Sequence, residues 1–490
     1  MEGMLKCIEE TLSPFRKCFS RTNCFKWFVI VICALMLRSD QLGITSVIRD
    51  LNLSHTCYES LLHFFRSKAY KLSALRRQWY KIVAGNAPIH RVAGRAIIIG
   101  DGVKQGKEAL RMPGVKKMVQ ESETCSKPEY IHGHLFGAVG VIISNSCKKF
   151  TLPLKINLQD GLKPVASWPE ANDVVEISAR SHVDQMIEAG FEVSEILGKV
   201  FFLLDRYFLS RSALELLDEK NGRCHDGENQ VEIITKAKSN CTAYRHPHRK
   251  KGSKGRPPKK GSTVKISQLF SQRRFFKEIR VQMYGKTETV SYYCLNLLWG
   301  QGLYRELRFV LVKYNGMKSI LVSTDTSLDP QTIIELYATR FGIEAFFREF
   351  KQQIGGLGYH FWTRFLPKLN HFAKKDAPDP LLSITDAHDR AKIIDAIHAI
   401  ETFVQCACIA MGITQMISLG GESRDEILKS RYLRTRSNTT PSEATVMHYL
   451  RKHLFTLLLH APESFVTQYI REKQSSMNAA DNSKNEAEAA

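Results

Sequence analysis

The sequence of 490 residues lacks the features that would mark a membrane or disulfide-rich secreted protein. The longest apolar run, Trp27 to Leu37, has 11 residues, whereas a bilayer span needs roughly 20. The 12 cysteines include no C-x-x-C pair, and scattered cysteines without partners are typical of a reducing cytosol. We therefore expect a cytoplasmic protein with no membrane partner, in which Trp27 to Leu37 forms a buried core helix.

Acidic residues are scarce relative to basic ones. Against 70 Lys and Arg stand 49 Asp and Glu, so the net charge is +21. From Lys236 to Lys286 there are 16 basic residues and one acid, Glu278, so this window alone carries +15. This excess of positive charge favours contact of the window with phosphates. The alternative is an ordinary solvated loop. The candidate DNA-binding residues in it are Arg249, Lys250, Lys251, Lys254, Arg256, Lys259 and Lys260.

The distribution of apolar residues predicts a mixed α/β core between helical segments. The predicted elements include helices over 176–197 and 441–472 and a hairpin turn at Tyr314-Asn315-Gly316. The predicted regions are a helical DNA-binding domain at 1–93, a catalytic core at 94–224 and 306–360, a basic and β-rich insertion at 225–305, a helical region at 361–473 and a disordered tail at 474–490. Within the first region, Gly43 to Ser67 is typical of a helix-turn-helix, with Asn52-Leu53-Ser54 as the turn. An ordinary helical hairpin is the alternative.

Two carboxylates follow apolar strands. Asp101 comes directly after Ala96–Gly100, and Asp205 directly after Val200–Leu204. The carboxyl ends of strands in an α/β sheet open onto a crevice, where sites commonly form. On neighbouring strands the two carboxylates would repel each other, and a divalent cation would relieve that repulsion. Taken singly, each aspartate also fits a turn or a helix cap.

A helix predicted from Gln331 to Gln353 adds a third carboxylate. At roughly 100° per residue, Tyr337, Arg340, Glu344 and Lys351 fall inside a roughly 60° arc beside the apolar face. Three carboxylates from separate elements could hold two Mg²⁺ or Mn²⁺ ions for phosphodiester cleavage. Arg340 and Lys351 would bind the DNA strand, and Tyr337 could hydrogen-bond a phosphate.

The spacing Tyr-x2-Arg-x3-Glu-x6-Lys resembles the YREK signature of bacterial insertion-sequence transposases of the DDE class. The surroundings are also similar: Ile-Gly-Asp at Asp101, Leu-Leu-Asp-Arg-Tyr at Asp205, and His132-Gly133-His134 between them. The resemblance covers roughly residues 90 to 360.

This resemblance implies an RNase H-like core in which Asp101, Asp205 and Glu344 are the catalytic metal ligands. It also implies a nucleoid-associated enzyme that cuts double-stranded DNA at terminal inverted repeats and joins the ends to target DNA, working as a homodimer in a synaptic complex. Two alternatives remain open. The protein could be a metal-dependent nuclease without strand transfer, or a catalytically inactive DNA-binding protein.

Overall fold

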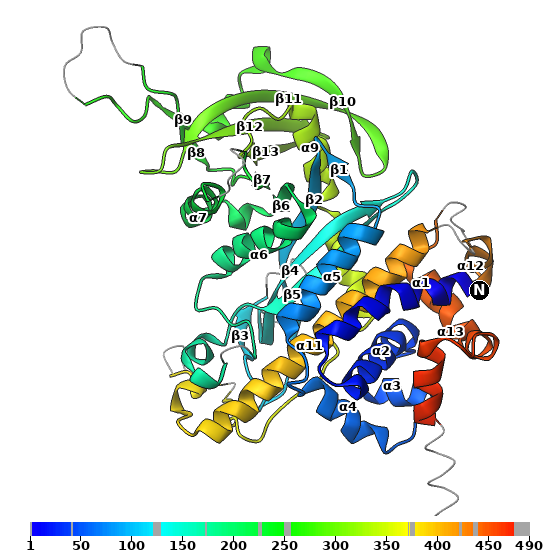
Figure 1. The fold of residues 1–490 in the computed structure, drawn as a ribbon. Helices are drawn as coiled ribbons and strands as arrows, with labels where there is room; N and C mark the ends of the chain where they lie inside the picture. The colour runs from blue at the N-terminus through cyan, green and yellow to red at the C-terminus, as the bar shows by residue number, and fades with distance from the viewer. Residues whose placement is uncertain are drawn as a thin grey trace, which may run out of the picture.

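The computed structural model describes most of the chain. The described residues are 2–40, 43–120, 129–171, 174–223, 228–248, 256–370, 372, 378–420, 424–434 and 440–474. Of the predicted tail, 475–490 lie outside them. The predicted α/β class is confirmed, because one large mixed sheet runs through the molecule with helices on both sides (Figure 1).

The half of the sheet that carries the predicted acids has the strand order β5-β4-β2-β6-β7. Strand β2 is antiparallel to β4 and parallel to β6, and β6 is parallel to β7, which is the arrangement of an RNase H-like core. The bounds are β1 Arg91–Val92, β2 Arg95–Gly106, β3 Lys116–Val119, β4 Tyr130–Ser144, β5 Lys149–Leu158, β6 Val200–Leu204 and β7 Val231–Lys236.

Glycines on β2 let helix α6 (His182–Leu197) lie close against one face of this sheet. A Cβ at Gly100 would stand 2.6 Å from the Phe202 ring and 2.7 Å from the sulfur of Met186. Since successive strand residues point to opposite faces, Asp101 faces the other side. Helix α10 (Gly342–Gln352) contacts β2 on this half of the sheet. The sheet therefore presents Asp101 away from α6.

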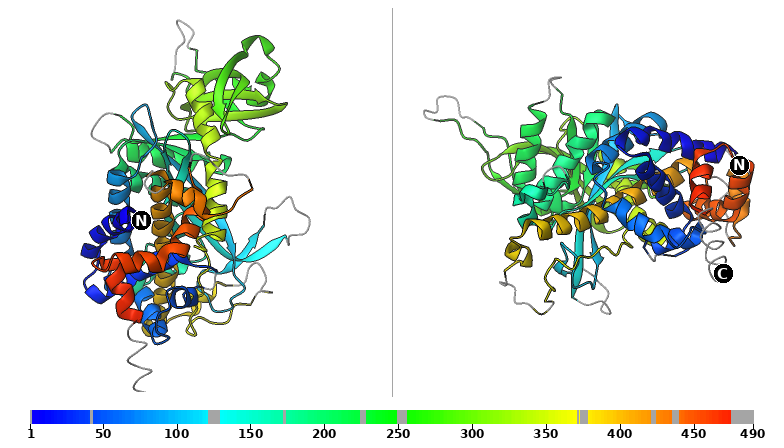
Figure 2. Two further views of the ribbon diagram at one scale, coloured as in Figure 1. Left: turned by 90° about the vertical axis from the view of Figure 1, so that its right-hand side faces the viewer. Right: turned by 60° about the horizontal axis from the view of Figure 1, so that its bottom comes forward.

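The second half of the sheet is antiparallel and contains the predicted β-rich insertion. Its strands are β8 Thr242–Tyr244, β9 Thr263–Lys265, β10 Lys277–Met283, β11 Lys286–Trp299, β12 Arg305–Tyr314 and β13 Met317–Ser323. The predicted hairpin turn joins β12 to β13, with φ of 46° at Asn315 and 76° at Gly316, as a type I′ turn requires. Figure 2 shows β10 and β11 standing beyond the helical body of the protein.

One strand assigned to the insertion belongs to the half of the sheet that carries the predicted acids. Val231–Lys236 lies inside the predicted 225–305 insertion, yet it pairs in parallel with β6 and antiparallel with β13. Its side chains are almost all buried, as in a central strand. The sequence prediction missed it because a six-residue segment with only three apolar residues, Val231, Ile233 and Ile234, does not reveal which strands it pairs with.

Helices from the two ends of the chain pack together into one body, as the blue and red helices in Figure 1 show. Arg451 donates to the carbonyl oxygens of Leu37 at 2.8 Å and Arg38 at 2.5 Å. The helices are α1 Glu2–Leu12, α2 Thr22–Leu37, α3 Thr45–Asp50, α4 Cys57–Phe65, α5 Leu72–Asn86, α7 Arg211–Asn221, α8 Ile266–Leu269, α11 Ala387–Leu419, α12 Arg424–Ser430 and α13 Glu443–His460. Short 3₁₀ helices are Ser13–Cys18, Lys163–Ser167, Pro169–Ala171, Arg206–Phe208, Arg273–Phe275 and Pro380–Ser383.

The apolar helices are core helices. In α2, every residue from Trp27 to Leu37 is at most 5% exposed, which confirms the predicted buried helix. Among the described residues, α11 alone is long and apolar enough to cross a membrane, and its apolar window is 100% buried inside the protein. Burial on all sides explains why these helices are apolar all round.

Three predicted helices differ from the observed ones. The single helix expected over 331–353 is two helices, α9 (Pro330–Thr339) and α10. The helix expected over 176–197 begins only at His182, where Ser181 caps it. The one expected over 441–472 is interrupted after His460, because Ala461-Pro462 follows and proline has no N–H for the helical ladder.

Candidate active site

Parallel pairing of β2 with β6 places the first two predicted acids side by side. Gly100 is opposite Leu204 in the register, so Asp101 and Asp205 are the next residues on adjacent strands. Asp205 precedes the 3₁₀ helix Arg206–Phe208, but its side chain makes no capping hydrogen bond there. Its carboxylate is therefore free of the local role that a helix cap would give it.

Arg340 contacts both carboxylates. Its Nη2 lies 2.9 Å from Asp101 Oδ2 and 3.6 Å from Asp205 Oδ1. The Arg340 side chain is 12% exposed, against 25% for Asp101 and 37% for Asp205. Its Nε is buried and has no hydrogen-bond partner among the described residues. The guanidinium thus places one positive charge beside two carboxylates, and its Nε–H makes no hydrogen bond within the described part of the chain.

The pKa of Asp101 is raised from 3.8 to about 6. Loss of water around the carboxyl is the main cause, and it outweighs the opposing effects of Arg340 and of the Gly102 N–H, which donates to Asp101 Oδ1 at 2.8 Å. The negative charges of Asp205 and Glu344 raise the pKa further. Such a concentration of acids in a partly buried place is typical of sites that bind a cation.

The third acid comes from the first turn of α10. Glu344 is exposed, and it lies near enough to raise the pKa of Asp101. At the other end of α10, Lys351 Nζ donates to the carbonyl oxygen of Lys104 on β2 at 3.1 Å. Tyr337, in the last turn of α9, has its pKa raised by burial, while nearby Arg340 lowers it. All four residues of the Tyr-Arg-Glu-Lys stripe therefore lie on the β2 side of the α9–α10 segment.

The break between α9 and α10 falls inside this stripe. Arg340 N donates to Tyr337 O at 3.1 Å and Glu344 N to Phe341 O at 3.1 Å, so the link is a tight turn of i to i−3 bonds. Gly342, a weak helix former, lies close to the sheet here, and a Cβ on it would stand 3.0 Å from Thr151 Oγ1. The 60° arc, which assumed one straight helix, is therefore not the reason that these side chains share a face. Packing of α10 against β2 and β5, and of α9 against β7, β10, β12 and β13, is the reason.

The donor set fits a hard divalent cation, since all three acids offer oxygen ligands. In the described part of the chain, the ligand atoms of Asp386, His388 and Asp389 lie within 4.8 Å of one another at the start of α11, whereas those of Asp101, Asp205 and Glu344 do not. Arg340 lies between the first two acids instead. Arg340 and a cation would therefore compete for the same two carboxylates.

The predicted basic residues are only partly described. Arg249, Lys250, Lys251 and Lys254 lie outside the described residues. Arg256 and Lys259 are exposed, and Lys260 Nζ lies over the rings of Tyr244 at 4.2 Å and Tyr304 at 5.4 Å.

The histidines of the predicted His-Gly-His segment include a structural one. His134 is fully buried; its Nδ1 lies 2.5 Å from the Tyr359 hydroxyl and its Nε2 lies 2.9 Å from Pro113 O. Burial lowers its pKa to about 4. His134 therefore joins β4 to the segment after α10 as a neutral side chain, while His132 is partly exposed.

Sequence reasoning missed a contact that brings the insertion to the candidate site. The Tyr284 ring, at the turn between β10 and β11, packs edge-on against Phe341 in the α9–α10 link, with 6.1 Å between ring centroids. The backbone N–H of Gln282 also donates to Glu335 of α9 at 3.0 Å. Tyr284-Gly285 was readable as a turn, but no local pattern shows where the tip of a hairpin docks.

Comparisons with known proteins identify no family for this chain. No family model matches the sequence, and no curated protein matches it either. Among solved structures, the NurA nuclease from Sulfolobus solfataricus is similar at 12% identity, over 59% of this chain and 86% of that one, with a TM-score of 0.22. A score that low carries no argument about fold or function. Conclusions about this protein therefore rest on its own residues.

Proposed function

We propose that the protein is a DDE-type DNA transposase, which cuts DNA at the terminal inverted repeats of an insertion sequence and joins the ends to target DNA. The observation that supports this most is that Asp101 and Asp205 share one arginine, Arg340, while Glu344 lies near enough to raise the pKa of Asp101. A purely structural salt bridge needs one carboxylate for one guanidinium. Two acids on one arginine, with a third acid nearby, leave an excess of negative charge that a bound cation would neutralise.

In this proposal, Asp101, Asp205 and Glu344 hold two Mg²⁺ or Mn²⁺ ions. When bound, such ions activate a water or 3′-hydroxyl nucleophile and stabilise the leaving oxygen. Arg340 leaves its two carboxylates and donates to a phosphate of the cleaved strand, as its planar guanidinium suits bidentate contacts. Tyr337 donates its hydroxyl to the same strand.

The chain also offers cationic groups for duplex DNA. Lys351 keeps the bound strand next to β2 through its charge, and the basic insertion contacts the transposon end next to the site. The Tyr284–Phe341 contact supports this placement of the insertion. Helices α3 and α4 of the N-terminal region contact the same DNA end, and two copies of the chain act together in a synaptic homodimer.

Metal-dependent nicking is the direct test. The protein is incubated with a linear duplex carrying the inverted repeats that flank its coding region, with Mg²⁺ and then with EDTA. We expect nicking by the wild type with Mg²⁺ alone, and loss of nicking in Asp101→Asn, Asp205→Asn and Glu344→Gln. Glu349→Gln is the matched control, because Glu349 lies on the same helix and hydrogen-bonds to Arg348. Equal nicking by the three variants and the wild type would refute the site.

Two further measurements separate the alternatives. Joining of a pre-cleaved 3′-hydroxyl end to target DNA distinguishes a transposase from a nuclease that lacks strand transfer. Tight, salt-sensitive DNA binding with no cleavage under any metal condition would instead indicate an inactive DNA-binding protein.

A further inference from the structure

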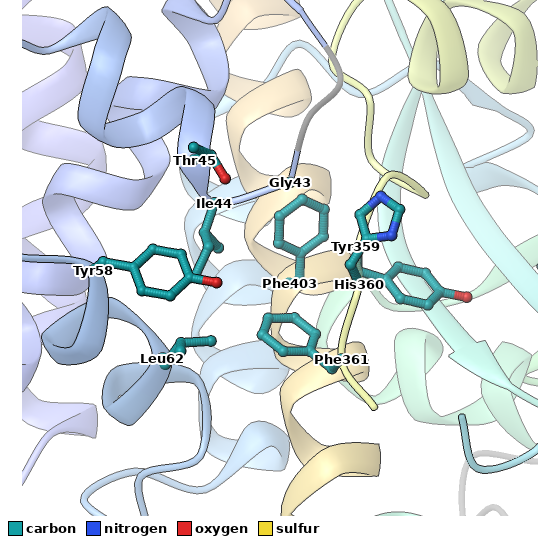
Figure 3. Close-up of a pocket in the computed structure, with 9 residues that line it drawn as sticks. All are labelled: Gly43, Ile44, Thr45, Tyr58, Leu62, Tyr359, His360, Phe361 and Phe403. Atoms are coloured by element: carbon teal, nitrogen blue, oxygen red, sulfur yellow. The ribbon is translucent and has the colours of Figure 1, made fainter. Parts of the chain in front are cut away.

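An aromatic pocket lies between the N-terminal helices and the segment that follows α10 (Figure 3). Its volume is about 320 Å³. Tyr58 and Leu62 of α4 form one side, His360 and Phe361 the other, and Phe403 of α11 lies between them. The full lining is Gly43, Ile44, Thr45, Tyr58, Leu62, Tyr359, His360, Phe361 and Phe403.

The inner wall of this pocket is rigid. Phe403 and Tyr359 are fully buried, and Phe361 is 3% exposed. The Phe403 ring packs edge-on against those of Phe361 and Tyr359, with 6.3 and 6.4 Å between centroids. The hydrogen bond between Tyr359 and His134 ties this wall to β4. Tyr58, which is 40% exposed, and His360, which is exposed, form the open rim.

A second pocket, of about 690 Å³, adjoins the first and shares His360 with it. Lys107 and Lys351 both line it, together with Gln105, Gln352 and the acid Glu108. Lys107 Nζ lies 3.9 Å from the Tyr359 ring centroid, so its charge stands directly beside the aromatic pocket. Lys351 also donates to Lys104, three residues beyond Asp101 on β2, so the second pocket lies further along the strand that carries Asp101.

We propose that these adjoining pockets bind one unpaired nucleotide of the DNA strand, with the base in the aromatic pocket and its phosphate beside Lys107 and Lys351. This inference rests on the proposed function and adds a binding site to it. Aromatic rings stack any base, and a lysine-lined groove follows the backbone, which is the common way to hold single strands. The Tyr58 hydroxyl and the Thr45 hydroxyl lie at the pocket and can reach the edge of a base.

The dimensions exclude a paired base. A pocket of about 320 Å³ is at the lower end of small-ligand sites, so a duplex cannot enter it. A base reaches the pocket only from a single-stranded tail or after it leaves the double helix. Leaving the double helix costs a few kcal/mol of unstacking and unpairing, which a base in a single-stranded tail avoids. Tailed DNA should therefore bind more tightly than blunt DNA of the same duplex sequence.

The test compares three ligands by fluorescence: a blunt duplex, the same duplex with a short single-stranded tail containing 2-aminopurine, and free dAMP. We expect the tailed duplex to bind best, with quenching of the 2-aminopurine as it stacks. Tyr58→Ala and His360→Ala should each reduce the preference for the tail by roughly 5- to 150-fold, which corresponds to removal of one stacking ring. Tyr58→Phe should keep it, because the ring remains.

Tyr432→Ala is the matched control, since Tyr432 is 84% exposed and lines neither pocket. A Leu62→Trp substitution, which fills the pocket, should abolish the preference even if truncation at the rim disturbs folding. Binding of blunt and tailed DNA with equal affinity would overturn the pocket and leave the proposed function standing. If free dAMP binds as tightly as the tailed duplex, the ligand of the pocket is a free nucleotide and not DNA. Absence of all DNA binding would overturn both proposals.

Discussion

Replacing Asp101 by asparagine should stabilise the protein in the absence of metal. In the folded state the pKa of Asp101 is about 6, against 3.8 for an ordinary aspartate. The folded state therefore holds the proton more strongly than the unfolded state, and stability falls as the pH rises from 3.8 to about 6. Above about pH 6, burial of the ionised carboxylate lowers the free energy of unfolding by its full amount. Asp101→Asn removes this loss because asparagine carries no charge.

The size of the effect follows from the pKa difference. The change from 3.8 to about 6 corresponds to roughly 3 kcal/mol. For a cooperative unit of this length, that is a rise in Tm of about 3 °C near neutral pH. The gain should vanish at about pH 4, where Asp101 is protonated in the folded state and costs little.

Differential scanning calorimetry of the two proteins, with EDTA and with Mg²⁺, checks this. Because metal binding requires a deprotonated ligand, Mg²⁺ should raise the Tm of the wild type near neutral pH and leave that of Asp101→Asn unchanged. Glu278→Gln, an exposed change on β10, is the control that should match the wild type in both conditions. An asparagine variant that is no more stable than the wild type, or that responds equally to Mg²⁺, would refute the reasoning.

Three further predictions concern stability and DNA affinity. Arg76 is fully buried between Glu401 and Glu176, so Arg76→Ala should lower the free energy of unfolding in urea by about 3–5 kcal/mol. The control is Arg77→Ala, which should lower it by less than about 1 kcal/mol, because the Arg77 side chain is 59% exposed in its pair with Glu195. Neutralising Lys259 and Lys260 together should lower the slope of log affinity against log salt by about 0.9 for each phosphate that these lysines neutralise in the wild type; an unchanged slope would show that they do not touch DNA. The contribution of buried His134 to stability should fall as the pH drops from 6.5 to about 4, opposite in sign to that of Asp101, because its pKa is lowered and the unfolded chain takes up the proton. The stability advantage of the wild type over His134→Gln, measured by unfolding at each pH, should shrink over this window.

Much of the half of the sheet that carries Asp101 and Asp205 could be predicted from local patterns. The strand before Asp205 is predictable residue for residue, because five apolar residues between Lys199 and an aspartate form a buried strand of ordinary length. The hairpin turn at Asn315-Gly316 is equally readable, since both residues tolerate positive φ. Helix α10 was expected, but its separation from α9 was not. A single glycine, here Gly342, is tolerated inside a strongly periodic segment and does not by itself predict that the helix ends.

The candidate site could be predicted as a set of residues but not as a geometry. The strand-end rule predicts that Asp101 and Asp205 lie together, and the register of β2 with β6 shows the same pair side by side. The position of Arg340 between them has no signature in the sequence, because it depends on how the α9–α10 link turns against the sheet.

Period, composition and chain order were enough to predict most of the helices and strands, the excess of positive charge in one window and the acid at the end of β6. The expectation that Asp101 also follows the end of a strand was wrong, because β2 continues to Gly106 in its pairing with β4. Only the folded chain shows that β7 is a central strand, that the tip of the insertion docks at Phe341, and that Tyr58 and His360 share one pocket. Each of these joins residues far apart in the chain. Such contacts depend on packing in three dimensions, which no local pattern encodes.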